Sequence, residues 1–225
     1  PTADRQALGP GTTIFSGHLR SGPAHIDRSI VEHFRFARHD CLQIFTVRQD
    51  WPLGTADVEV VYDRAGRPLR MWKRLLLPGL PDPVAKAEIR RYEFRTEPVS
   101  IRRRDGEGRI DHELLKGGKP EVVIGPGRGL ISIWLQREKL EPGQIVRRMA
   151  IDVRGLEKIQ RVALRREEDR YLEEVGKKVR VYTFFGRESV FADENDVVLG
   201  DLAGLRPHAS LKTTAPAAVP AFGPL

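Results

Sequence analysis

Apolar and polar residues alternate along most of the chain. Phe34 and Phe36 are separated by polar neighbours, and the same pattern recurs in residues 58–62, 145–153 and 179–185. Alternation with a period of two places one face of a strand on a core and leaves the other face partly in water. In residues 179–185, this alternation assigns Val179 and Val181 to the same face of the strand. The pattern therefore predicts β-strands through most of the chain.

Short glycine turns separate these stretches, for example at Asp63–Gly66, 105–108, 117–118 and 142–143. Turns of this kind between strands indicate hairpins rather than strand–helix–strand crossovers. Only residues 130–140 carry a clear helical spacing of apolar side chains. We therefore expect a mainly β protein, an antiparallel sheet of eight or more strands with one or two short helices.

The pattern divides the chain into three parts. Residues 1–11 form an extended leader without apolar periodicity, and because the first residue is not methionine we interpret the start as processed. Residues 12–205 form a single antiparallel β domain, and residues 206–225 form a Pro/Ala-rich tail. The tail buries too little apolar surface to offset the entropy of ordering it alone. We predict that it docks on another subunit through three apolar anchors, Val219, Phe222 and Leu225.

Composition narrows the choice of function. Of 225 residues, 40% are hydrophobic and 31% charged, a composition that excludes a disordered chain. The sequence contains no run of about eighteen apolar residues, the length needed to span a membrane. One cysteine cannot form an internal disulfide. The net charge of +7 comes from cations interleaved with acids, as in Arg165-Arg166-Glu167-Glu168. Because nucleic-acid binding needs cations gathered on one face, this arrangement argues against a nucleic-acid partner.

A glycine-rich loop at 125–129 joins a short strand to the predicted helix. Such a loop can hold phosphate, but Leu130 stands where a dinucleotide-binding loop has its third glycine, and no lysine precedes Ser132. We interpret it as a flexible connection rather than a nucleotide site. The unusual segment 69–79 mixes cations with tryptophan and leucine. We read it as a strand with Leu69, Met71, Leu75 and Leu77 facing inward, and a membrane-surface or partner contact is the alternative.

Histidines cluster early in the chain. A hairpin turning at 21–23 would place His18 opposite His25, with His33 and His39 farther along the strand. Two ligands do not define a metal site, so we predict no metal and no other cofactor. Cys41 follows His39-Asp40, but adjacent residues on a strand face opposite ways, and we interpret the cysteine as a small buried side chain. No catalytic set is recognisable.

Four stretches carry a resemblance to a known group of proteins. They are 60–68, 140–144, 176–182 and 193–200: a Tyr-Asp turn, a Pro-Gly before a long strand, a basic strand, and an aspartate-rich turn before Val-Leu-Gly. In this order they resemble β-rich bacterial exported domains, some lipid-anchored, and more distantly the half-barrel of periplasmic lipoprotein carriers. The resemblance covers roughly residues 12–202. It implies a strongly curved sheet or half-barrel, a cell-envelope location and an apolar concavity, but no catalytic residue.

Three functions follow as hypotheses. The first is a non-enzymatic exported binding or scaffold subunit of a cell-envelope assembly, held to other protein subunits by its extended termini. The second is a periplasmic carrier of a lipid or other apolar ligand in the concave face of the sheet, with Trp51, Trp72 and Trp134 as lining residues. The third is an enzyme with a pocket in the β-barrel.

Overall fold

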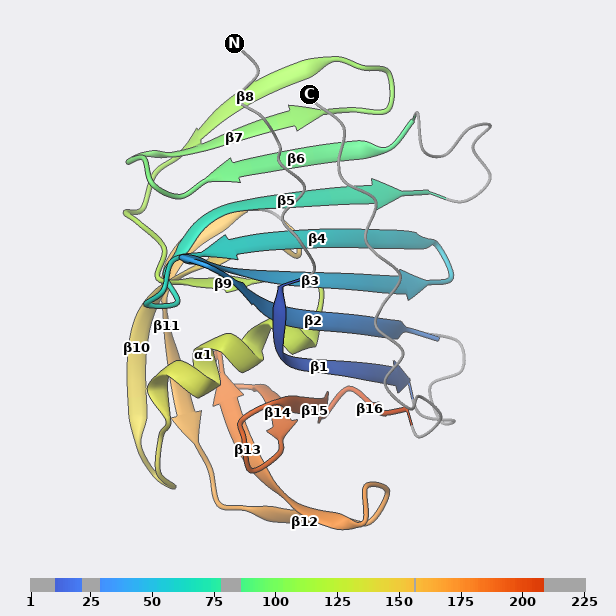
Figure 1. Ribbon diagram of the computed structural model, residues 1–225, viewed down its shortest axis with the longest axis vertical. Coiled ribbons are helices and arrows are strands. Elements are labelled where there is room, and N and C mark those ends of the chain that lie inside the picture. Colours follow the sequence, from blue (N-terminus) through green and yellow to red (C-terminus); the bar gives the residue numbers. More distant parts are fainter. Residues whose placement is uncertain (1–10, 22–28, 78–85, 156, 209–225) are drawn as a thin grey trace.

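The computed structural model describes residues 11–21, 29–77, 86–155 and 157–208. It confirms the predicted fold class. Consecutive strands β1 to β8 form an antiparallel meander, to which β16 is added at the β1 edge. Figure 1 shows this curved sheet running along the molecule, with the second sheet gathered at its lower end. In spatial order the nine strands are β16 (Leu205–Pro207), β1 (Thr12–Ser21), β2 (Val31–His39), β3 (Leu42–Trp51), β4 (Gly54–Tyr62), β5 (Pro68–Leu76), β6 (Glu88–Glu93), β7 (Val99–Arg104) and β8 (Ile110–Leu115).

The second sheet is antiparallel except at one edge, where β9 pairs in parallel with β10. A parallel neighbour is possible here because the long connection between these strands contains the helix. The strands in spatial order are β15 (Val198–Asp201), β14 (Glu188–Ala192), β13 (Lys177–Phe184), β11 (Lys158–Arg166), β10 (Ile145–Asp152) and β9 (Val122–Ile124), and β12 (Arg170–Leu172) pairs with β13.

The helix fills the space between the two sheets. Helix α1 (Ile131–Glu138) follows a 3-10 turn at Arg128–Leu130, close to the predicted 130–140. Five consecutive helix residues are buried, from Ile131 to Leu135, because strands of both sheets pack around them. They share one core with the aromatic side chains Phe34 and Phe45 of the large sheet. The concave face of the large sheet is therefore covered in part by α1 and the turn before it, and in part by the connection between β10 and β11.

One predicted strand face differs from the structure, and another, shared by Val179 and Val181 as predicted, packs outside the main core. Leu77 was expected inward but lies after the end of β5 with 53% of its surface exposed, and the buried face of that strand carries Lys73 instead. On β13 the main core receives Tyr182 and Phe184, whereas Val179 and Val181 form a small second cluster with Phe191 on the other side. Both faces of β13 are covered, so alternation alone could not identify the core face.

The predicted tail begins inside the sheet. β16 includes residues 206 and 207, which pair with Arg20 and Leu19 of β1. The anchors Val219, Phe222 and Leu225 and the leader up to residue 10 lie outside the described residues. Within the described part of the chain, no helix is long and apolar enough to cross a membrane.

Candidate binding cleft

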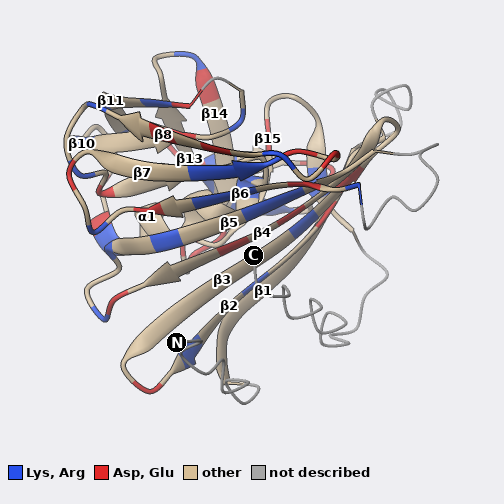
Figure 2. Ribbon diagram, turned by 90° about the horizontal axis from the view of Figure 1, so that it is seen from above, with Lys and Arg blue, Asp and Glu red and all other residues tan. Residues whose placement is uncertain are grey.

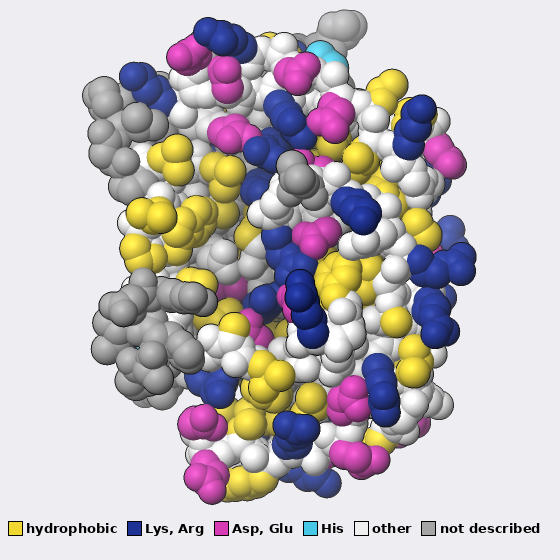
Figure 3. Space-filling view, turned by 180° about the vertical axis from the view of Figure 1, so that it is seen from behind, with side chains coloured by type: hydrophobic (Ala, Val, Ile, Leu, Met, Phe, Trp, Pro, Cys, Tyr) yellow, Lys and Arg dark blue, Asp and Glu magenta, His cyan; other side chains and the backbone are white. Residues whose placement is uncertain are grey.

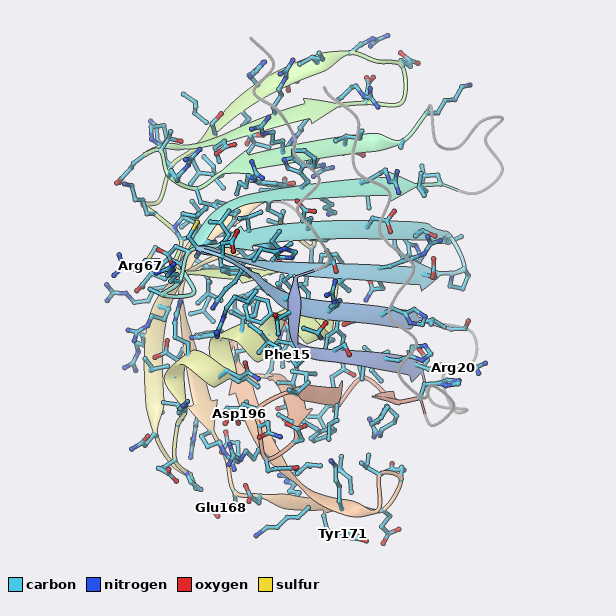
Figure 4. The ribbon with its side chains drawn as sticks, viewed as in Figure 1. Phe15, Arg20, Arg67, Glu168, Tyr171 and Asp196 are labelled. Carbon is cyan, nitrogen blue, oxygen red and sulfur yellow. The ribbon has the colours of Figure 1, made fainter. Side chains whose placement is uncertain are left out.

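One large cleft opens where the two sheets diverge. Its volume is about 1020 Å³, which is in the range of small-molecule and peptide sites. Phe15 of β1 and Asp196 of the turn between β14 and β15, both labelled in Figure 4, line this cleft. The lining residues come from β1, the end of α1, the β11–β12 and β13–β15 segments: Ile14–Ser16, Gln136, Lys139–Pro142, Arg166, Asp169, Arg180 and Asp193–Val197.

One wall of the cleft is the edge of a strand. β16 pairs with β1 only at Leu19–Ser21, and the last described contact on that side is the His208 N–H, which donates to the His18 carbonyl at 2.9 Å. The preceding residues Thr12–Gly17 pair with β2 alone among the described residues, although β15 also lies near β1. A register shift between Thr13 and Phe15 leaves Ile14 outside the β2 register, and 40% of its surface is exposed.

The opposite wall is a set of paired charges. Asp196 lies in the left-handed region at φ 61°, and its Oδ1 accepts hydrogen bonds from Arg180 at 2.8 Å and from the Tyr182 hydroxyl at 2.7 Å. The pKa of the Tyr182 phenol is raised, mainly by burial and to a smaller extent by the neighbouring Asp196. The guanidinium of Arg166 is buried, lies over the Tyr182 ring and pairs with Asp169. This wall is therefore rigid, with its buried charges already satisfied.

The cleft combines apolar side chains with the backbone edge of a strand. Apolar surface is provided by Ile14, Phe15, Leu140, Pro142 and Val197, beside the backbone edge of β1. Neither histidine nor cysteine is among the described lining residues.

The three tryptophans proposed as lining residues do not share a surface. Trp134 is 2% exposed on α1, inside the core, whereas Trp51 is half-buried at the turn between β3 and β4. Trp72 is on the face of β5 opposite Met71, away from the core, with the guanidinium groups of Arg70 and Arg91 over its ring. Beside Trp134 the free space is about 10 Å³, room for one water molecule at most.

The register places arginines of β6 and β7 in line with Trp72 of β5. On the face of the large sheet away from α1, Trp72, Arg91 and Arg102 lie opposite one another on β5, β6 and β7. Figure 2 shows basic segments repeated along these strands. Across the face seen in Figure 3, basic and acidic side chains alternate. That the chain has no nucleic-acid partner stays a prediction.

The arrangement predicted for the histidines is wrong. The Cα partner of His18 is His33, not His25, because β2 begins only at Val31 after a longer connection. The rings of His18 and His33 stack with centroids 3.9 Å apart, and the His208 ring lies 4.6 Å from His18. Residue 25 is outside the described residues. In the described part of the chain, no group of three or more His, Cys, Asp or Glu side chains is placed to hold a metal ion.

Cys41 and the glycine loop also differ from expectation. Cys41 is exposed in the tight turn between β2 and β3, where Asp40 has a φ of 45°.

The loop at 125–129 is not a loose connection, because its backbone binds a carboxylate of the same chain. Glu32 on β2 is fully buried and accepts hydrogen bonds from the Arg128 N–H at 2.8 Å and the Gly129 N–H at 2.7 Å. The anion site of this loop is therefore filled by Glu32.

Comparisons with known proteins define no family for the chain. No protein-family model matches it, and no curated protein sequence matches it. Among solved structures, the crystal structure of a DUF1089 family protein from Pseudomonas aeruginosa is similar over 89% of this chain and 95% of that chain, with a TM-score of 0.45 and 13% identity.

Sequence reasoning missed the cleft. Its walls come from segments more than a hundred residues apart, Ile14–Ser16 and Asp193–Val197, and neither segment carries a motif of known chemistry. The one signal in the sequence is the aspartate-rich turn at 193–196, which also belongs to the resemblance to exported domains. The partial pairing of β16 with β1 is a property of the tertiary fold and has no sequence signature.

Proposed function

We propose that this protein is a non-enzymatic binding subunit that holds an extended segment of a partner protein in the cleft. The observation that carries the proposal is the edge of β1 at Ile14–Ser16, which lines the cleft and, among the described residues, pairs with no strand on the side away from β2. An extended peptide can join such an edge through main-chain hydrogen bonds, while its side chains enter neighbouring pockets. The exposed Ile14 and the partly buried Leu140 and Val197 offer apolar contacts for those side chains.

A binding role is also supported by the charges of the cleft. The buried guanidinium group of Arg166 and the partly exposed one of Arg180 are matched by Asp169 and Asp196, so these groups orient a ligand without needing to be neutralised by it. The concave face of the large sheet offers less space for a ligand, because α1 and the connection between β10 and β11 cover it. We therefore favour a peptide in the cleft over a lipid in the concave face.

We extend the proposal to the cell envelope, because the resemblance carried by the turn and strand motifs is to exported domains. Fractionation of cells that make the full natural gene product tests this part. Recovery of the protein with the membrane or periplasmic fraction is expected, and recovery with cytoplasmic markers contradicts it.

Selection of displayed peptides on the purified protein tests the binding role. Binding of the selected peptides should shift the backbone amide signals of Thr12–Ser16. Ile14→Lys should lower the affinity for these peptides roughly tenfold, because it places a charge at the apolar wall. Leu53→Lys is the matched control, because Leu53 is 74% exposed at the turn between β3 and β4, outside the cleft. Peptides that bind Ile14→Lys as tightly as the wild type would contradict the proposal.

A further inference from the structure

The opposite edge of the large sheet is also open. β8 is the outermost strand in Figure 1, and among the described residues it pairs with β7 alone. Ile110 is 49% and Leu114 65% exposed, which is unusual for large apolar side chains on a strand. An edge strand with exposed apolar residues is a template for another strand, and natural proteins leave such edges open mainly where pairing has a use.

The two faces of β8 carry different chemistry. Ile110, His112 and Leu114 share the face directed away from the core, and Asp111 and Glu113 share the other face. A strand added to β8 would therefore meet Ile110 and Leu114, with His112 between them, on one face and an acidic row on the other. The complementary strand alternates apolar residues with lysine or arginine.

The acidic row is only partly neutralised by its own chain. Arg103 on β7 contacts Glu113 at 2.8 Å and stands opposite Asp111 in the register, but it also pairs with Glu157 in the core. One guanidinium thus pairs with two carboxylates, and a third, that of Asp111, stands opposite Arg103 in the register. The Asp111 carboxylate accepts the His112 backbone N–H at 2.8 Å, so this amide does not need a strand partner in the free protein.

The geometry points to β8 as a docking edge for a strand of a partner protein in which apolar residues alternate with basic ones. A second copy of this chain fits less well. Antiparallel pairing of two β8 strands about His112 would bring Asp111 of one copy opposite Glu113 of the other, and like charges directly opposite destabilise a sheet. A basic strand removes this repulsion and covers Ile110 and Leu114.

Titration of the intact chain with a short synthetic peptide of alternating valine and lysine tests the inference. We expect it to bind roughly tenfold more tightly than a valine–glutamate peptide of the same length, and to shift the amide signals of β8. Because the whole chain carries a net charge of +7, non-specific attraction would favour the glutamate peptide instead. Equal binding of the two peptides, or tighter binding of the glutamate peptide, overturns the inference.

Variants separate this edge from the cleft. Leu114→Lys should lower the affinity for the valine–lysine peptide roughly tenfold, whereas Leu53→Lys and Ile14→Lys should leave this affinity unchanged. Thermal melting confirms that each variant is folded, as expected for exposed positions. Loss of binding in Ile14→Lys would move the peptide to the cleft and overturn the inference. Self-association that Leu114→Lys abolishes would identify a second copy as the occupant and overturn it as well.

Discussion

The buried carboxylate of Glu32 shows how single residues join the two layers. It extends from β2 to the loop before α1, where two backbone N–H groups and the side chain of Gln49 donate to it. Free N–H groups at the start of a helical segment favour a negative charge. Gly129 is required at this contact, since a Cβ there would lie 2.3 Å from the ring of Phe34.

Gly129→Ala should lower the free energy of unfolding by about 1–3 kcal/mol, because the added methyl group overpacks the core against Phe34. Chemical denaturation measures the change. Gly155→Ala is the matched control, because nothing lies within 4 Å of a Cβ at Gly155 and its backbone is not left-handed. A Gly129→Ala protein as stable as the control would refute the requirement for close approach.

Glu32 should also make stability depend on pH. Burial raises the pKa of this carboxyl to about 7 in the folded protein, against the opposing effect of the N–H groups of Gly129 and Arg128. The folded state then holds a proton that the unfolded state releases near pH 4.5, so the stabilisation present at low pH is lost as pH rises towards 7. Relative to Glu32→Gln, the wild type should lose up to about 3 kcal/mol between pH 4.5 and pH 8. Denaturation curves of both proteins at several pH values measure this difference, and parallel profiles would contradict it.

At the scale of elements, the outer strand β16 is attached by a row of imidazoles. His208, at its end, and His18 and His33 on β1 and β2 lie side by side across three strands. Both ring nitrogens of His18 are buried without a hydrogen-bond partner. Burial, and then the neighbouring imidazoles and Arg20, lower the pKa of His18 to about 4.

Acid should therefore weaken this attachment. The folded state takes up the His18 proton only near pH 4, whereas the unfolded state takes it up near pH 6.5, so stability is lost as pH falls through this window. His18→Phe keeps the stacking and removes the proton, and should reduce the loss between pH 7 and pH 5 by roughly 1 kcal/mol after allowance for solvent screening. Amide exchange of β16 and denaturation at both pH values provide the measurement. An unchanged acid response in His18→Phe would show that another group is responsible.

Strand positions were predictable from the sequence, but pairing between distant strands was not. Alternation and glycine turns identified β2 and β4, and the helical spacing identified α1, because each is a local pattern. The register of His18 with His33 depended on the length of the connection between β1 and β2, which the hairpin assumption made too short. The cleft depended on where β16 stops along β1. Such contacts are fixed by packing of the whole chain and leave no local pattern.

At the scale of the molecule, the two sheets are held together by buried ion pairs as well as by the core. Glu157, on the connection between β10 and β11, is 3% exposed at its side chain and receives hydrogen bonds from Arg90 and Tyr92 on β6 and Arg103 on β7. Burial alone would raise the pKa of the Glu157 carboxyl, but Tyr92 and Arg90 hold it below its ordinary value. The carboxylate is therefore charged and links the second sheet to the far half of the first.

Glu157→Ala should be strongly destabilising, by about 3 kcal/mol or more, because it leaves two guanidinium groups and a buried hydroxyl without their common acceptor. Glu107→Ala is the matched control: Glu107 pairs with Arg109, but both side chains are more than 70% exposed, so its loss should cost under about 1 kcal/mol.

The destabilisation caused by Glu157→Ala should not be confined to one strand. Because Glu157 joins the two sheets, amide exchange should rise in both β6–β7 and β10–β11, and these regions should unfold at lower denaturant than α1. A loss of stability no larger than in the control, or faster exchange in one sheet alone, would show that the apolar core and α1 hold the sheets together without this carboxylate.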